Sequence, residues 1–164
     1  MSSAFTIDAL LPTDWEQVRA IYLQGIATGL ATFETEAPPW ERWDAAHHPF
    51  ARLAARTGEQ LWGWAALAPV SSRAVYRGVA EVSIYVRDTA RGRGVGRALL
   101  EKLITVSETN GIWTLQAGLF AFNQPSLALH KACGFREVGR RERIGQLRGE
   151  WLDTLLLERR SARF

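Results

Sequence analysis

The sequence has little of several features that mark particular classes of protein. It contains one cysteine among 164 residues, which excludes an intramolecular disulfide and is typical of a reducing compartment. No apolar run approaches the roughly 18–20 residues that span a bilayer. Residues 1–5 have neither a basic start nor an apolar core, so no signal peptide is expected. We therefore expect a cytoplasmic protein that does not enter a membrane.

The sequence also has little excess of one charge over the other. The 20 Lys and Arg residues exceed the 17 Asp and Glu residues by a net charge of only +3. A nucleic-acid-binding protein with a dedicated basic face carries much more, so no nucleic acid partner is expected. The basic residues concentrate in residues 91–97 and 136–148, which suits an anionic cofactor.

The remaining composition is that of a globular protein. A chain of 164 residues can bury a substantial core, and 47% hydrophobic with 23% charged residues is ordinary. Internal repeats, low-complexity tracts and linkers are absent from the sequence. We expect a single domain over residues 1–164, with its core at about residues 5–160.

Hydrophobic periodicity predicts the order of secondary structure. The predicted strands are residues 5–10, 50–56, 61–69, 79–86, 113–120, 135–142 and 151–158. The predicted helices begin at residues 12–14 and end at Gly29, then cover residues 40–47, 94–110 and 124–133. The first should bury Val18, Ile21, Tyr22 and Ile26, and the third Val95, Leu99, Leu103 and Val106. Mixed strands with helices on both faces give an α/β fold.

The glycine- and arginine-rich run at residues 91–97 lies between an apolar strand and a helix. Glycines at alternate positions let a ligand lie against backbone N–H groups. The start of a helix adds unpaired N–H groups and the positive end of the helix dipole, which favour an anion. Interleaved arginines match phosphate oxygens. The run predicts a pyrophosphate cradle made by Arg91, Gly92, Arg93, Gly94, Val95, Gly96 and Arg97.

Two common phosphate motifs do not fit this run. A mononucleotide P-loop needs a Gly-Lys-Ser/Thr ending that is absent from the sequence. The dinucleotide fingerprint needs G-x-G-x-x-G, whereas Gly92, Gly94 and Gly96 give G-x-G-x-G. A glycine-rich turn with solvated arginines is the remaining structural explanation.

A second segment, residues 123–135, reads N-x-x-S-x-x-L-H-x-x-x-G-F. Asn123 is a good helix N-cap, Pro125 fits the first turn and Gly134 is a natural stop. With the R-x-x-G-x-G pattern of Arg91, Gly94 and Gly96, this block resembles the GNAT N-acetyltransferase family.

The resemblance implies that residues 91–97 hold the pyrophosphate of acetyl-CoA and that no metal is needed. It further implies cofactor contacts from Asn123, Ser126, His130 and Lys131, and a mixed, mostly antiparallel central sheet. His130 stands where many members carry a tyrosine proposed as general acid.

Residues 31–36, 75–86 and 111–118 are similar to the phosphinothricin and methionine sulfoximine N-acetyltransferase branch. The similarity runs from about residue 6 to about residue 160. It implies an enzyme that acetylates the α-amino group of a small glutamate-like amino acid analogue by direct transfer in a ternary complex. A homodimer is expected as well, with Trp151, Leu155 and Leu157 as candidate contacts.

Side chains alternate along strand 79–86, so Glu81, Ser83 and Tyr85 share one face. The other face, with Val82, Ile84 and Val86, is predicted to be core. An acid in an otherwise apolar strand is costly unless it faces a cleft or has partners. Glu81 is therefore the predicted general base, which takes the proton of the substrate ammonium directly or through water.

The backbone of the same strand is predicted to bind the cofactor. Ser83, Ile84, Tyr85 and Val86 should pair with the pantetheine amides, so that the cofactor arm extends the sheet like a strand. A backbone N–H of Val82 or Ile84 would polarise the thioester carbonyl.

Three further residues are predicted to bind substrate. Arg73 can pair bidentately with the α-carboxylate. Phe33 and Glu34 lie on the loop where the family places substrate contacts. Cys133 is expected to be a buried structural thiol and His47 with His48 to be surface residues.

Other functions fit parts of the sequence. An acetyltransferase for protein N-termini or polyamines would share the fold, although the long acidic runs that favour a polyamine site are absent from the sequence. A non-catalytic module that binds CoA, a nucleotide or RNA would release no thiol, and RNA binding would be salt-sensitive.

Overall fold

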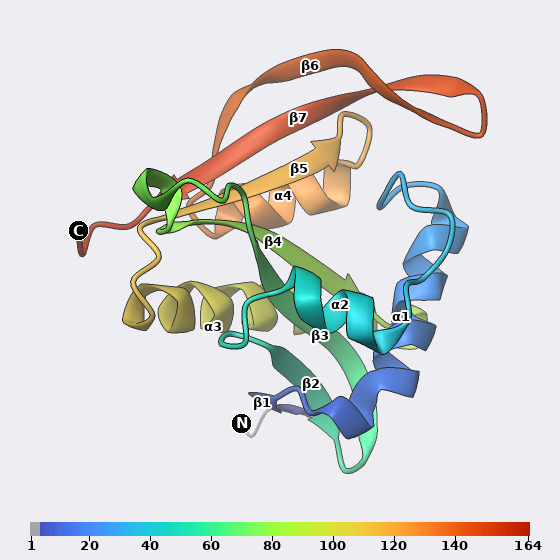
Figure 1. Cartoon of the computed structure of the whole chain (residues 1–164). Helices are drawn as coiled ribbons and strands as arrows, with labels where there is room; N and C mark the ends of the chain where they lie inside the picture. The colour runs from blue at the N-terminus through green and yellow to red at the C-terminus, as the bar shows by residue number, and fades with distance from the viewer. Residues whose placement is uncertain (1–3) are drawn as a thin grey trace.

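A seven-stranded sheet runs through the molecule in the order β1-β2-β3-β4-β5-β7-β6 (Figure 1). The computed structural model describes residues 4–164. The strands are β1 (Thr6–Ala9), β2 (Leu53–Thr57), β3 (Gln60–Pro69), β4 (Val79–Val86), β5 (Thr114–Phe120), β6 (Arg136–Leu147) and β7 (Glu150–Arg160). Neighbouring strands are antiparallel except β4 and β5, which are parallel. The expected mixed, mostly antiparallel sheet is confirmed.

The helices also follow the sequence pattern. They are α1 (Trp15–Thr28), α2 (Trp40–Ala46), α3 (Val95–Thr109) and α4 (Gln124–Ala132), with 3₁₀ turns at Pro12–Asp14, Ala74–Tyr76 and Asp88–Ala90. Gly29 ends α1 with a φ of 68°, a left-handed conformation that glycine adopts at little cost. The Asn123 side chain caps α4 by accepting a hydrogen bond from the Ser126 N–H.

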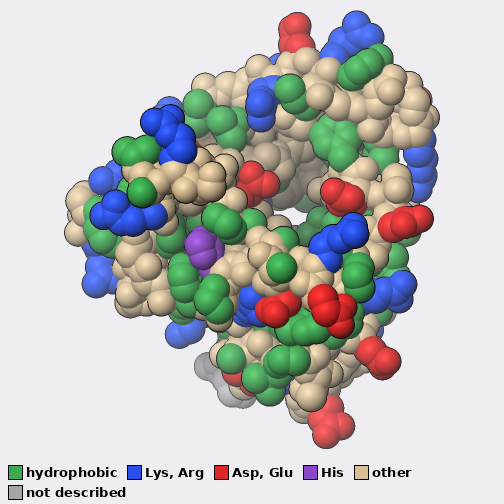
Figure 2. Space-filling view, viewed as in Figure 1, with side chains coloured by type: hydrophobic (Ala, Val, Ile, Leu, Met, Phe, Trp, Pro, Cys, Tyr) green, Lys and Arg blue, Asp and Glu red, His purple; other side chains and the backbone are tan. Residues whose placement is uncertain are grey.

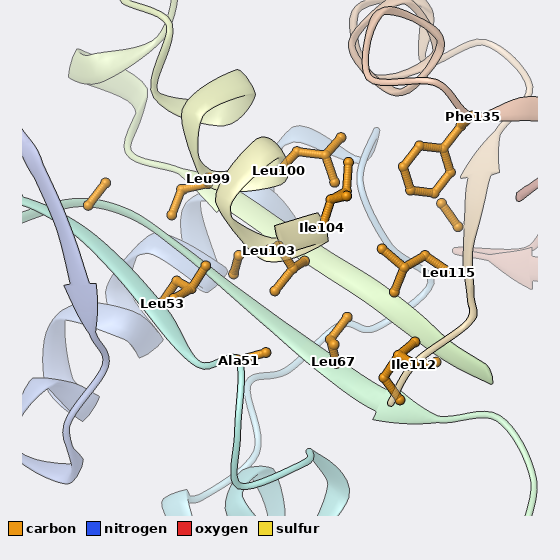
Figure 3. Close-up of a cluster of buried hydrophobic side chains, with 14 of the residues drawn as sticks. Ala51, Leu53, Leu67, Leu99, Leu100, Leu103, Ile104, Ile112, Leu115 and Phe135 are labelled. Carbon is orange, nitrogen blue, oxygen red and sulfur yellow. The ribbon is translucent and has the colours of Figure 1, made fainter. Parts of the chain in front are cut away.

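Alternating side chains along β3 divide the core between the two faces of the sheet. Ala65 and Leu67 belong to a cluster with the apolar stripe of α3, and Figure 3 shows Leu99, Leu103 and Ile104 in this cluster. Trp64 and Ala66 point to the other face, against α1 and α2. Burying a large apolar side chain stabilises the fold by about 1.5–3 kcal/mol. Helices therefore cover both faces, as the sequence predicted.

The hairpin of β6 and β7 is longer than predicted. The two strands meet at Arg148 and Gly149, whose φ values of 50° and 84° suit a two-residue hairpin turn. A bulge between Arg141 and Gly145 interrupts the ladder. Apolar residues do not alternate with polar ones over residues 143–148, so hydrophobic periodicity predicted too early an end for the strand.

This hairpin corrects part of the expected dimer surface. Leu155 and Leu157 are only 6% and 0% exposed, so they are core residues and cannot form a contact between subunits. Trp151 is 51% exposed. The dimer itself stays a prediction.

Within residues 4–164, no helix has the length and apolarity to cross a membrane. The expectation that residues 1–5 are not a signal peptide falls mainly on residues 1–3, which lie outside the described residues.

Candidate active site

The parallel strands β4 and β5 part after three rungs. The paired residues are Val79 with Thr114, Ala80 with Leu115, and Glu81 with Gln116. Beyond this point, residues 82–86 and 117–120 line a cavity of about 1440 Å³. Figure 2 shows this hollow and a small opening through the molecule. Backbone N–H and C=O groups need partners, so the edge of β4 that has left the ladder can take up a ligand with amides of its own.

The predicted alternation along β4 is confirmed. Val82, Ile84 and Val86 pack against the core cluster beneath α3. Tyr85 faces α1 and α2, where its ring stacks on Trp64 with centroids 5.0 Å apart. The gap between β4 and β5 is thus reached from both faces of the sheet.

Residues 91–97 lie on the α3 side of the gap. Gly92 and Gly94 have φ values of 74° and 80°, so both need glycine for their backbone conformation. Gly96 does not. A Cβ there would lie 3.4 Å from Leu129 and 3.6 Å from Val86, which is ordinary contact. Because the packing of the protein does not require glycine at this cavity-lining position, the missing side chain leaves room for a ligand.

The charges of this loop fit an anion. Arg91 and Arg97 line the cavity, at the mouth of α3. Arg97 also pairs with Glu101 at 2.8 Å, which raises the pKa of the arginine. Arg93 lies over the Trp62 ring at 5.3 Å and is not among the cavity-lining residues. The start of the helix and two arginines therefore gather positive charge at this end of the cavity, as the predicted pyrophosphate cradle requires.

Three of the four predicted α4 residues line the same cavity, namely Asn123, Ser126 and His130. Asn123 also donates a hydrogen bond from Nδ2 to the Leu30 carbonyl at 3.0 Å. Lys131 instead pairs with Glu137 at 3.6 Å, away from the cavity lining.

His130 is only 3% exposed. Its Nδ1 lies 2.7 Å from the Ser126 carbonyl oxygen, so Nδ1 carries the proton. Burial lowers the pKa of the ring and keeps it neutral. Nε2 is then an acceptor, and it has no hydrogen-bond partner among the described residues. A neutral ring in this tautomer has no proton at Nε2, which argues against His130 as the general acid.

Glu81 lies on the last rung before the strands part. Gln116 Nε2 donates a hydrogen bond of 2.9 Å to its Oε2. The carboxylate belongs to the cavity lining. The predicted base therefore lies at the start of the gap between β4 and β5, on the wall of the cavity.

The loop of residues 30–39 forms another part of the cavity wall. Phe33 meets Phe120 of β5 edge-on, with ring centroids 4.8 Å apart. It also contacts β6, since a Cβ on Gly145 would lie 3.1 Å from its ring. Together with the Asn123–Leu30 hydrogen bond, these contacts join the loop to both halves of the molecule. Phe33 and Glu34 line the cavity, and their contact with substrate stays a prediction.

An aromatic wall follows behind this loop. It consists of Tyr22, Trp43, Trp64 and Tyr85, all cavity-lining. Burial raises the pKa of both tyrosines, so they remain neutral phenols. Gly25 makes room for Tyr85, because a Cβ there would lie 2.7 Å from its ring. Of these four residues, the sequence pattern marked Tyr22, which lies on the predicted buried stripe of the first helix.

Other predicted residues lie elsewhere. Arg73 is exposed, with its guanidinium 5.4 Å from the Tyr76 ring centroid, and it is not among the cavity-lining residues. Its role as carboxylate partner stays a prediction. His47 and His48 are half-buried rather than surface residues, and His47 stacks on Trp43 at 4.3 Å. Cys133 is half-buried rather than buried, and this partial burial raises the pKa of its thiol, which disfavours the nucleophilic thiolate.

Metal ligands do not gather here. Among residues 4–164, no group of three His, Cys, Asp or Glu side chains is arranged to hold a metal ion.

The sequence of this site matches a known family. The profile of the Acetyltransferase (GNAT) family matches residues 15–135, about three quarters of the chain. The chain belongs to the GNAT family. Within it, the chain is 36% identical over 166 residues to the phosphinothricin N-acetyltransferase of Alcaligenes faecalis, covering 95% of this chain and 82% of that protein.

Solved structures of GNAT proteins agree. A phosphinothricin acetyltransferase from Sinorhizobium meliloti in complex with acetyl-CoA superposes with a TM-score of 0.88 at 28% identity, covering 96% of this chain and 88% of that one. A ribosomal-protein-alanine N-acetyltransferase from Brucella melitensis gives 0.87 at 32%, covering 95% and 99%. The protein is an acetyl-CoA-dependent N-acetyltransferase, and its relatives include proteins named as phosphinothricin and methionine sulfoximine acetyltransferases.

Proposed function

We propose that this enzyme acetylates the α-amino group of a small glutamate-like amino acid analogue, of the phosphinothricin or methionine sulfoximine and sulfone type. The position of Glu81 carries the proposal. It lies on the rung where β4 and β5 part, between the glycine-arginine loop on one face and the aromatic wall on the other.

The two reactants approach this gap from opposite faces. The acetyl-CoA pyrophosphate lies at residues 91–97, and its pantetheine arm follows the unpaired edge of residues 82–86. The amino acid enters on the face of α1 and α2, beside Tyr22, Phe33 and Tyr85. One continuous cavity is lined by both sets of residues and can hold both molecules at once, which supports direct transfer in a ternary complex.

Acetyl-CoA supplies the thioester. Glu81 takes a proton from the substrate ammonium, directly or through water, and frees the nitrogen lone pair. The amine then attacks the thioester carbonyl carbon, so that a C–N bond forms, the C–S bond breaks and CoA leaves as the thiolate. An acetylated enzyme is not required, since Cys133 does not line the cavity.

A small substrate fits the closed shape of this side. The loop of residues 29–39 is fixed to β6 and to α4 through Phe33 and Leu30, which bounds the chamber. Similarity to a ribosomal-protein-alanine acetyltransferase favours a second candidate, an N-terminal alanine of a protein. A peptide would need this loop to open.

A thiol-release assay tests the proposal. Acetyl-CoA is offered with phosphinothricin, methionine sulfoximine, methionine sulfone, the common amino acids and a peptide that begins with alanine. We expect thiol release with the first three, with kcat/KM well above that of the peptide. Turnover of the peptide alone would replace the proposed substrate class, and no release with any amine would contradict it.

A further inference from the structure

The arginines of β6 differ in their partners. Arg136 pairs with Glu158, Arg140 pairs with Asp153 at 2.6 Å, and Arg143 lies over the Trp151 ring at 5.6 Å. Arg141 lines the cavity. Within residues 4–164 its side chain has no hydrogen bond, ion pair or aromatic partner, so its charge is free for a ligand.

Strand register places Arg141 on the substrate face. Arg141 is opposite Thr154, and Thr154 is opposite Phe120. Along β5, Phe120 and Gln116 point to the same side, because they are four residues apart. Gln116 in turn holds Glu81. Arg141 and Glu81 therefore share one face of the sheet, the face that α1 and α2 cover.

The spacing suits a small zwitterion. Two strand spacings of about 4.8 Å and four residues of about 3.3 Å separate the Cα atoms of Arg141 and Gln116 by roughly 16 Å. An extended arginine side chain covers about 6–7 Å of this, since each bond is about 1.5 Å long. Because both side chains rise from the same face, a small molecule that lies over β5 and β7 can contact Arg141 at one end and Glu81 at the other.

We propose that Arg141 binds the oxygen-bearing end of the substrate side chain, such as a phosphinate or a sulfone, while the amine lies at Glu81. This inference rests on the proposed function and names the residue that selects the side chain. A planar guanidinium gives two parallel hydrogen bonds to such an oxygen pair. Arg141 thereby becomes the specificity residue on the wall farthest from β4.

A second unpaired arginine is the main alternative to Arg141 as the residue that binds the substrate side chain. Arg42 of α2 also lines the cavity and has no ion-pair partner within residues 4–164. It does not belong to the sheet face that joins Arg141 to Glu81. The acids of the cavity lining are Glu34, Glu36 and Glu81, and none of them forms an ion pair with Arg141.

Substrate pairs test the assignment. Arg141→Ala, Arg141→Lys, Arg42→Ala and the control Arg140→Ala are compared on phosphinothricin and on methionine, which lacks side-chain oxygens. We expect Arg141→Ala to lower kcat/KM for phosphinothricin at least tenfold and for methionine less than twofold, with the KM of acetyl-CoA unchanged. Arg141→Lys should recover part of the loss, because the ammonium keeps the charge but not the fork. Arg140→Ala should match the parent.

Three results would overturn the assignment: no loss in Arg141→Ala, an equal loss on both substrates, or the selective loss in Arg42→Ala instead. Calorimetry with phosphinothricin and CoA separates this inference from the proposed function. If the parent binds phosphinothricin without acetylating it, and Arg141→Ala loses that binding, the function fails while the role of Arg141 stands. If the parent does not bind phosphinothricin, both fail.

Discussion

Glu81 and Gln116 are joined by a hydrogen bond of 2.9 Å across the last rung that β4 and β5 share. The amide holds the carboxylate at the point where the strands separate and the cavity begins. This geometry makes Gln116 a positioning residue for the proposed base.

Glu81→Gln should lower kcat about 10²–10⁴-fold, the usual contribution of a general base. The dissociation constant of acetyl-CoA should change little, because the side chain acts on the amine. Raising the pH should restore part of the rate, since more of the substrate amine is then neutral. Steady-state kinetics from neutral to alkaline pH, with calorimetry for acetyl-CoA, measure both. Near-normal turnover at neutral pH would remove Glu81 from the mechanism.

Gln116→Leu should lower kcat by less than Glu81→Gln and leave the acetyl-CoA affinity intact. The Glu81 carboxylate remains in this variant, but no hydrogen bond from residue 116 holds it in one orientation. Gln116→Asn should behave like Gln116→Leu, because its shorter side chain places the amide too far from the Glu81 carboxylate. Equal activity in parent and both variants would show that the hydrogen bond does not position the base.

Gly96→Val should weaken acetyl-CoA binding at least tenfold without unfolding the protein. The position has an ordinary backbone conformation, and an added Cβ makes only ordinary contacts with Leu129 and Val86, so the main loss of room falls on the ligand. Gly139→Val is the matched control, since a Cβ at Gly139 would meet nothing within 4 Å and this residue does not line the cavity. Calorimetry and thermal melting are the measurements. Unchanged affinity in a folded Gly96→Val protein would contradict the cradle.

Gly25→Ala should disturb Tyr85, because the added Cβ would lie 2.7 Å from its ring. We expect a loss of about 1–3 kcal/mol in the free energy of unfolding, as for other overpacked cores. The KM of the amino acid should rise, and that of acetyl-CoA should not. Combining Gly25→Ala with Tyr85→Leu should cost less than the sum of the two, which urea unfolding can measure. If the losses in unfolding free energy of the two single variants simply added, Gly25 would not act through its contact with Tyr85.

Stability should fall as the pH drops below about 6.5, the ordinary histidine pKa. Burial lowers the pKa of His47, His48 and His130, so the unfolded chain binds protons that the folded protein refuses. The stabilisation is complete above the unfolded pKa and is lost as the pH falls. In His130→Gln, the difference in unfolding free energy between about pH 7.5 and 5.5 should be smaller than in the parent. An identical difference would contradict the buried neutral state.

Local features were predictable because they depend on neighbouring residues. Gly94 starts α3, Asn123 caps α4 and Gly29 ends α1, each at a position marked by its own residue type. The alternation along β4 likewise placed Glu81 and Tyr85 on one face.

Features that join distant segments were not predictable in the same way. Periodicity assigns a side chain to a face, but it does not say which strands pair or where the pairing stops. The parting of β4 and β5 after Glu81 is such a feature. The free cation at Arg141 is another, since its neighbours Arg140 and Arg143 find partners on β7.

The sequence by itself determined the family and marked the candidate phosphate loop and the candidate base, because each rests on a short motif whose chemistry is local. The tertiary structure alone decided the shape of the substrate side. It brought Phe33, Phe120 and Gly145 into contact, and it left Arg73 outside the cavity lining. Such contacts depend on how separate segments pack in three dimensions, and the side-chain pattern of any one segment carries no record of them.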